Sequence, residues 1–233
     1  MKKKILISTG GSGGHVIPAI AFYDHLKKNF DVFLALDKRG SSFINKEKYE
    51  YKIINSPRLT LNFLKLPITL VNLVISIIKS FFFLKKNNVD ILLGTGGYMS
   101  VPICIAAKIL NIKIYLFEPN MVIGRANKFL IKFSKKLFCY SEKIINFPEN
   151  EKDKIVVINK VLRKEIYNFN NYTKEKIDNK INLLIVGGSQ GAKFFDEKLK
   201  NSILELSKKY KLMIYHQVSS LDFEDLKFLC WCY

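Results

Sequence analysis

Three apolar segments of this chain each end in a cluster of glycines, and a segment with helix-forming character follows each cluster. They are ILISTGGSGGHV from Ile5, ILLGTGGYMSVP from Ile91 and INLLIVGGSQGA from Ile181. A short aliphatic run that stops at glycines is typical of a strand buried in a parallel sheet, and the segment after it is typical of a crossover helix. The repeated order of strand, turn and helix therefore predicts an α/β fold.

Glycines at the carboxyl ends of parallel strands predict a site for an anion. They let the backbone approach a ligand with its N–H groups turned inward, and the following helix adds its N-terminus. A GxGxxG dinucleotide motif read from Gly11 fails at Val16, although Asp37, at the end of the next predicted strand, keeps a nicotinamide nucleotide as the runner-up. No GK[ST] motif accompanies Lys193. The turns therefore favour phosphate or pyrophosphate bound without a P-loop lysine.

His15 directly follows the first glycine cluster, and the sequence predicts a helix over residues 18–28. Close to a helix N-terminus the dipole disfavours the imidazolium form, so a neutral ring there can accept a proton from a sugar hydroxyl. The alternative is a structural histidine that hydrogen-bonds the loop. His216 ends a later predicted strand, where it could face the same cleft or be structural.

The pattern divides the chain into two α/β regions. Residues 1–163 are expected to form one Rossmann-like domain, and the polar, Asn- and Lys-rich residues 164–180 a linker. The pattern restarts over residues 181–233. Because a doubly wound domain needs about 100 residues or more, this second domain is expected to be incomplete at its C-terminal end.

One segment interrupts the alternation of strands and helices. Residues 66–84 are apolar on nearly every face and approach the length of a membrane-spanning helix, with Lys65, Lys85 and Lys86 at the ends. The segment could span a bilayer, could be a core helix, or could pack on the sheet and leave apolar surface for lipid, with its lysines at anionic headgroups. The third interpretation is preferred, because a spanning segment would split the sheet.

The composition favours anionic partners. The formal charge is +18, from 38 Lys and Arg against 20 Asp and Glu, which suits phosphorylated substrates, an acidic membrane face or nucleic acid. Lysines are spread along the chain, so compositional drift is an equal alternative. The four cysteines follow no metal-binding spacing, and the first apolar run stops too early for a signal peptide, so we expect a reduced chain that is not exported.

Four motifs, in order along the chain, resemble those of the family of peptidoglycan N-acetylglucosaminyltransferases that convert lipid I to lipid II (the MurG family). They are GGSGGHVIPA, LLGTGGYMSVP, FEPNMVIGRANKFL, and LLIVGGSQGA followed by YHQ. The resemblance implies a glycosyltransferase-B fold, with two Rossmann-like domains facing each other across a cleft. It also implies that the first domain receives the lipid-linked acceptor and that the second holds most contacts to the donor, UDP-GlcNAc.

Carried over residue by residue, the resemblance implies a set of site residues. His15 matches the histidine implicated in catalysis. Asn120 matches the asparagine of the family's H-E-Q-N, which reads F-E-P-N here, and Arg163 matches the arginine of G-N-P-V-R, which reads N-K-V-L-R. The residues assigned to UDP-GlcNAc are Ser12, Gly13, Gly14, Asn120, Arg163 and Ser189. Those assigned to the acceptor pyrophosphate are Gly96, Gly97 and Tyr98.

The activity implied is that of a hexosyltransferase. GlcNAc passes with inversion from UDP-GlcNAc to the muramoyl 4-hydroxyl of undecaprenyl-pyrophosphoryl-MurNAc-pentapeptide, giving a β-1,4 linkage. No cofactor, metal or nucleic acid is expected. The segment Leu61–Leu84 falls at the family's membrane patch, which implies a peripheral protein on the cytoplasmic face of the bacterial inner membrane. The alternatives are another glycosyltransferase-B enzyme acting on a glycolipid, a sugar-nucleotide epimerase of the same fold, and an inactive fragment that retains the acceptor and membrane half.

Overall fold

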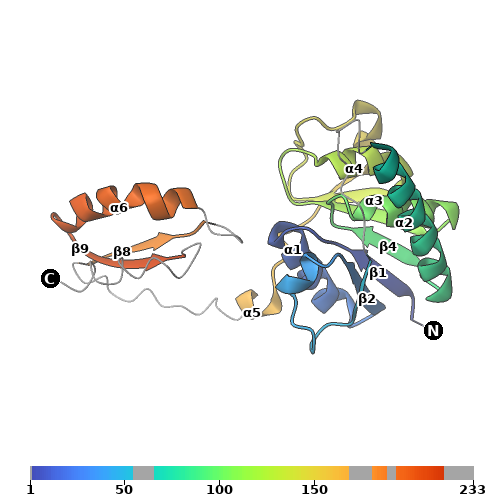
Figure 1. Ribbon diagram of the computed structural model, residues 1–233, viewed down its shortest axis with the longest axis horizontal. Helices are drawn as coiled ribbons and strands as arrows, with labels where there is room; N and C mark the ends of the chain where they lie inside the picture. The colour runs from blue at the N-terminus through green and yellow to red at the C-terminus, as the bar shows by residue number, and fades with distance from the viewer. Residues whose placement is uncertain (1, 55–65, 168–179, 188–192, 218–233) are drawn as a thin grey trace. The chain divides into compact units, whose positions relative to one another are not determined.

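The protein is described by a computed structural model that covers residues 2–54, 66–167, 180–187 and 193–217. The chain forms two compact units, residues 1–170 and residues 171–233 (Figure 1). The α/β class predicted from the sequence is confirmed in both units, since the strands pair in parallel throughout the described residues.

The first unit is a seven-stranded parallel sheet with the order β3-β2-β1-β4-β5-β6-β7. The strands are β1 (Lys4–Ser8), β2 (Asp31–Leu36), β3 (Tyr51–Ile53), β4 (Ile91–Gly94), β5 (Lys113–Glu118), β6 (Lys136–Cys139) and β7 (Ile155–Val157). The α-helices are α1 (Gly13–Leu26), α2 (Leu66–Lys86), α3 (Ser100–Ile109), α4 (Arg125–Leu130) and α5 (Lys164–Tyr167). Short 3-10 helices are η1 (Gly40–Phe43), η2 (Ile131–Phe133) and η3 (Glu149–Lys154).

The central strands are buried on both faces, which explains their continuous aliphatic sequences. In β1, Leu6 packs into a cluster with α2, α3 and α4, whereas Ile5 and Ile7 pack into a second cluster with α1. All three side chains are at most 5% exposed. The alternation of side chains along each strand therefore builds one hydrophobic core on either face of the sheet.

The strand order reverses between β1 and β4. From β1 the chain moves outward to β2 and β3, and α2 then carries it back to β4, which pairs with the other side of β1 with Ser8 opposite Gly94. The two described glycine turns follow these two strands. They therefore lie side by side at the topological switch point, where open parallel sheets bind ligands.

Helix α1 begins earlier than the sequence predicted. It starts at Gly13 rather than at Pro18, and the proline lies inside the helix. Pro18 has no N–H to donate to the carbonyl of Gly14, so the helix forgoes one hydrogen bond in its second turn. The expectation was wrong because proline marks a helix start only on average, and here the glycines themselves adopt helical geometry. His15 consequently lies in the first turn of α1.

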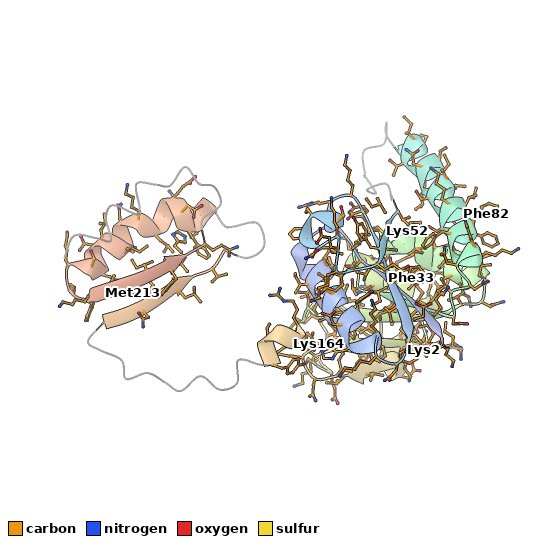
Figure 2. All side chains as sticks on the ribbon, turned by 90° about the horizontal axis from the view of Figure 1, so that it is seen from below. Lys2, Phe33, Lys52, Phe82, Lys164 and Met213 are labelled. Atoms are coloured by element: carbon orange, nitrogen blue, oxygen red, sulfur yellow. The ribbon has the colours of Figure 1, made fainter. Side chains whose placement is uncertain are left out.

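Helix α2 packs Leu84, Ile77, Phe81 and Phe83 against the core, but it also exposes many large apolar side chains. Its buried side also carries the small hydroxyl residues Thr69, Ser76 and Ser80, none more than 6% exposed. Its exposed side carries large apolar residues: Ile68, Leu70, Val71, Val74, Ile75, Ile78 and Phe82. Figure 2 shows Phe82 on the outer side of the helix, pointing away from the sheet.

Helix α2 packs against α3, and small residues on both helices allow this close approach. Pro67–Lys86 is long and apolar enough to cross a membrane by length and composition, but α2 is also the crossover between β3 and β4 of one sheet. A crossover within one sheet fits the preferred interpretation of the segment, a helix packed on the domain with an apolar outer face. Residues 61–65 of the predicted membrane segment lie outside the described residues.

The second unit contains one parallel β-α-β motif. Strands β8 (Lys180–Ile185) and β9 (Lys211–His216) pair in parallel, and α6 (Lys193–Ser207) connects them. Asp196 of α6 is buried, and its Oδ1 lies 3.2 Å from Nε2 of His216. His216 thus has a neighbour inside its own unit. This agrees with a structural role for His216, which is one of the two roles that the sequence left open.

Candidate functional site

The glycine turns adopt backbone conformations that other residues rarely reach. Gly11 has a φ of 82°, Gly96 of 92° and Gly97 of 80°. Within the described residues, the N–H groups of Gly13, Gly14, Gly96 and Gly97 donate no hydrogen bond to the chain. Backbone donors left over at the switch point are suited to bind an anion.

Asp37 ties the two turns together. Its Oδ1 accepts hydrogen bonds from the N–H groups of Gly11 at 3.0 Å and Gly40 at 2.7 Å, and its Oδ2 accepts one from Tyr98 Oη at 2.6 Å. Burial raises the pKa of this carboxyl, but the hydrogen bonds from Tyr98, Gly11 and Gly40 favour the ionised form, and the pKa lies below its ordinary value. The carboxylate is thus engaged in holding the loops, which leaves it poorly suited to bind a ribose.

His15 is fixed by the turn after β4. Its Nδ1 lies 2.8 Å from the carbonyl oxygen of Thr95, and Thr95 Oγ1 donates to the carbonyl of His15 at 3.2 Å. A carbonyl only accepts, so Nδ1 carries the proton in this hydrogen bond. In the neutral ring, Nε2 is then the unprotonated nitrogen. That tautomer suits a general base, because the basic nitrogen is the one directed away from the backbone.

Glu118, at the end of β5, organises the neighbouring loop. It is 1% exposed. Its Oε1 accepts from Asn120 Nδ2 at 2.9 Å, and its Oε2 accepts from the N–H of Gly124 at 2.8 Å and from Asn127 Nδ2 at 3.0 Å. The buried carboxylate therefore sets the orientation of Asn120, and Asn127 also donates to the carbonyl of Phe117 at 3.0 Å.

These elements surround a pocket of about 690 Å³. One part of its lining is polar and comes from α1, from the turn after β4, from the end of β5 and the loop after it, and from Arg125 and Asn127 of α4. The other part is apolar and comes from α2, α3 and α4. The lining residues are His15, Leu73, Gly96, Gly97, Tyr98, Val101, Ile105, Glu118, Asn120, Gly124, Arg125, Ala126, Asn127 and Phe129.

The pocket collects some of the residues predicted from the sequence. His15, Asn120, Gly96, Gly97 and Tyr98 all line it. Asn120, assigned to the donor by resemblance, thus shares a pocket with the turn assigned to the acceptor.

The other predicted residues are not among the described residues that line the pocket. Ser12, Gly13 and Gly14 lie just before His15, at the start of α1. Arg163 is exposed and directly precedes α5. Ser189 lies outside the described residues. The roles assigned to all of these residues stay predictions.

Sequence reasoning missed two positioning residues. Glu118 was visible as a carboxylate at a strand end inside the quoted FEPN motif, which is the signal that could have found it. Asn127, 1% exposed, gave no such signal because it lies within a helix sequence. Its Oδ1 is buried and accepts no hydrogen bond from any described residue.

The described part of the chain contains no cluster of three or more His, Cys, Asp or Glu side chains that could hold a metal ion. Cys104 and Cys139 are free thiols and buried. Burial raises the pKa of the Cys104 thiol to about 12, so this side chain behaves as a small apolar group.

A sequence model of the Glycosyltransferase family 28 N-terminal domain matches residues 5–139, a range that contains every residue of the pocket. Two relatives carry the name UDP-N-acetylglucosamine–N-acetylmuramyl-(pentapeptide) pyrophosphoryl-undecaprenol N-acetylglucosamine transferase. The one from Pelagibacter ubique is 54% identical over 97% of this chain, and the one from Rickettsia canadensis is 33% identical over 96%. The chain spans 63% and 62% of their lengths.

Solved structures confirm the fold. MurG of Acinetobacter baumannii superimposes with a TM-score of 0.72 at 26% identity, covering 98% of this chain and 64% of that protein. UDP-GlcNAc 2-epimerase of Neisseria meningitidis, bound to UDP-GlcNAc, gives a TM-score of 0.62 at 17% identity, covering 97% of this chain and 69% of that protein. The second likeness concerns the fold alone. Together with the first, it agrees with the predicted glycosyltransferase-B architecture.

Proposed function

Since this chain belongs to glycosyltransferase family 28, whose N-terminal domain it carries, we propose that it is the acceptor-binding part of a hexosyltransferase of peptidoglycan synthesis. The reaction is the inverting transfer of GlcNAc from UDP-GlcNAc to the muramoyl 4-hydroxyl of undecaprenyl-linked lipid I, which gives lipid II. The names of the relatives from Pelagibacter and Rickettsia support this activity.

One observation carries the proposal. His15, held in a defined tautomer, lines the same pocket as an apolar wall from α2, α3 and α4. The N–H groups of Gly96 and Gly97, which have no partner among the described residues, line it too. A base, an anion site and an apolar wall are the three features that a lipid pyrophosphate acceptor with a reactive hydroxyl requires.

In the proposed mechanism, the 4-hydroxyl oxygen attacks the anomeric carbon of GlcNAc. The new C–O bond forms as the bond to the UDP phosphate breaks, and UDP leaves with the bonding electrons. His15 Nε2 takes the hydroxyl proton while the Thr95 carbonyl holds the proton on Nδ1. The N–H groups of Gly96 and Gly97 bind the acceptor pyrophosphate and position the muramoyl sugar.

For the donor, Ser12, Gly13, Gly14, Asn120, Arg163 and Ser189 remain our proposed contacts. Gly13 and Gly14 offer N–H groups at the start of α1, where the helix dipole favours the phosphate charge that develops on UDP. Most donor contacts are expected in the second domain, consistent with a donor site that residues 1–163 do not complete.

We place the protein at the cytoplasmic face of the bacterial inner membrane, as a peripheral protein. The exposed apolar face of α2 supports this placement, because exposed apolar side chains such as Phe82, which is 64% exposed, are stabilised by burial in lipid. Lys79, Lys85 and Lys86 on the same helix are exposed and suit anionic headgroups.

The test is a transfer assay with a chimera that joins this chain to the C-terminal region of the Pelagibacter relative. Radiolabelled UDP-GlcNAc is supplied with either lipid I or diacylglycerol. We expect transfer to lipid I. We also expect His15→Gln to reduce the rate of this transfer at least about 100-fold. Transfer to diacylglycerol and not to lipid I would overturn the substrate assignment in favour of a glycolipid enzyme. An unchanged transfer rate in the His15→Gln variant would show that His15 is not the general base.

A further inference from the structure

The pocket has two chemically different ends. At one end are the N–H groups of Gly96 and Gly97, His15 and the exposed guanidinium of Arg125, which suit an anionic headgroup. At the other end the wall is apolar and comes from three helices, through Leu73 of α2, Ile105 of α3 and Phe129 of α4, as well as Val101 and Ala126. A ligand that fills the pocket must therefore be amphiphilic.

A sugar fits the apolar end poorly. Its hydroxyl groups would lose hydrogen bonds to water, and the side chains of Leu73, Ile105 and Phe129 offer none in return. The volume of about 690 Å³ lies within the range of small-molecule pockets, about 300–1,000 Å³. A branched hydrocarbon chain can occupy this end without such a loss.

The apolar end also adjoins the helix with the apolar outer face. Leu73 lines the pocket, whereas Val74 and Ile78 of the same helix are exposed on its outside. Leu73 and Val74 are adjacent residues, so a hydrocarbon chain in contact with the outer side of α2 lies next to the pocket wall. The same helix thus serves as membrane contact and pocket wall.

We propose that this pocket binds the isoprenoid units nearest the pyrophosphate of a prenyl pyrophosphate, lifted out of the bilayer, with the pyrophosphate at the N–H groups of Gly96 and Gly97. The inference rests on the proposed function and adds to it a chain-binding site inside the protein. The first units of the chain are held between α2, α3 and α4, so the headgroup is presented at a fixed height above the membrane.

The test measures binding to the full chain by isothermal titration calorimetry, with four soluble ligands below their micellar concentrations. The ligands are inorganic pyrophosphate, a C15 prenyl pyrophosphate, the matching C15 prenyl alcohol, and dihexanoyl-phosphatidylglycerol as a phospholipid. We expect the prenyl pyrophosphate to bind at least about tenfold more tightly than pyrophosphate, since even partial burial of a five-carbon unit exceeds that threshold. The alcohol and the phospholipid are expected to bind at least about tenfold more weakly than the prenyl pyrophosphate.

Two variants on α3 locate the chain. Ile105→Trp fills the apolar end and should remove the tenfold advantage while leaving the affinity for inorganic pyrophosphate unchanged. Ile109→Trp makes the same change on the same helix, at a residue that is 59% exposed and does not line the pocket, and should keep the advantage. Phe129→Ala, at a side chain 46% exposed, removes part of the wall without adding bulk and should reduce the advantage at least about threefold.

The outcomes separate this inference from the proposed function. If inorganic pyrophosphate binds and the prenyl pyrophosphate binds no more tightly, the proposed site for the hydrocarbon chain is wrong and the proposed anion site is retained. If Ile105→Trp keeps the full advantage, the chain lies on the outer face of α2 and the proposal is overturned. Equal affinity for the phospholipid also overturns it, in favour of a general lipid site. If neither pyrophosphate ligand binds, both proposals fail at the anion site.

Discussion

Replacing Asp37 by alanine tests the network that holds the two glycine turns in place. The change removes a buried acceptor of three hydrogen bonds and leaves the N–H groups of Gly11 and Gly40 without their partner. Each buried donor without a partner costs about 1–3 kcal/mol, so the free energy of unfolding of the first unit should fall by about 2–6 kcal/mol. Tyr98→Phe removes one hydrogen bond to a charged group and should cost about 1.5 kcal/mol.

The ionisation of Asp37 should make the stability of the first unit depend on pH. Its folded-state pKa lies below the ordinary value of 3.8, so the unfolded state binds the proton more readily. The stabilisation is therefore fully present above about pH 4 and is lost as the pH falls through the folded-state pKa. The difference in stability between wild type and Asp37→Ala should narrow below pH 4.

Urea denaturation followed by far-ultraviolet circular dichroism measures both effects. Asp31→Ala is the matched control, because this residue begins β2, the strand that ends just before Asp37, and has an exposed carboxyl 3.8 Å from Lys4 Nζ. Its effect should stay below about 1 kcal/mol. A loss from Asp37→Ala no larger than that of the control, or a difference that does not change with pH, would refute the account of the network.

Three further experiments test other parts of the structure. Gly96→Ala places a side chain on a residue with a φ of 92°, with its Cβ 3.1 Å from His15 Cε1. It should lower the free energy of unfolding in urea by about 1–2 kcal/mol and displace the His15 ring. Gly14→Ala, whose Cβ has ordinary contacts, should have neither effect. Cys104 should react with a thiol reagent at pH 8 only after unfolding, because its thiol is buried with a pKa of about 12; rapid labelling of the native protein would contradict its burial. Replacing both Ile75 and Ile78 by glutamate should weaken binding to anionic vesicles, measured by sedimentation, at least about tenfold. Replacing both by serine removes the apolar contact without adding charge, so this variant separates the two effects. Unchanged binding would exclude α2 as the membrane contact.

The periodic parts of the fold could be predicted from the sequence. Aliphatic runs that end in glycine identified β1 and β4, since a strand buried on both faces needs apolar side chains in succession. The same pattern identified β8, although its Ile181 and Leu184 are exposed. The pairing of β1 with β4 could not be read from local pattern, because the strand order is set by how the crossovers pack. That pairing is what brings the two glycine turns together.

The candidate site was predictable where backbone chemistry decides it. Gly96 and Gly97 were identified because their positions favour residues without a side chain, and His15 because it adjoins such a turn. The role of Asp37 was not foreseen. A carboxylate at the end of the second strand suggested a ribose partner, whereas its hydrogen bonds to Gly11, Gly40 and Tyr98 depend on contacts that are distant in the sequence.

The account depends most on the anion site at the turn after β4. Backbone amide resonances of the ¹⁵N-labelled chain, followed while a water-soluble lipid I analogue is added, test it most directly. We predict that the N–H resonances of Gly96 and Gly97 move in a saturable way and that those of the exposed strand residues Ile181 and Met213 do not. A saturable response confined to other residues, with Gly96 and Gly97 unmoved, would contradict the claim that these amides bind the acceptor pyrophosphate.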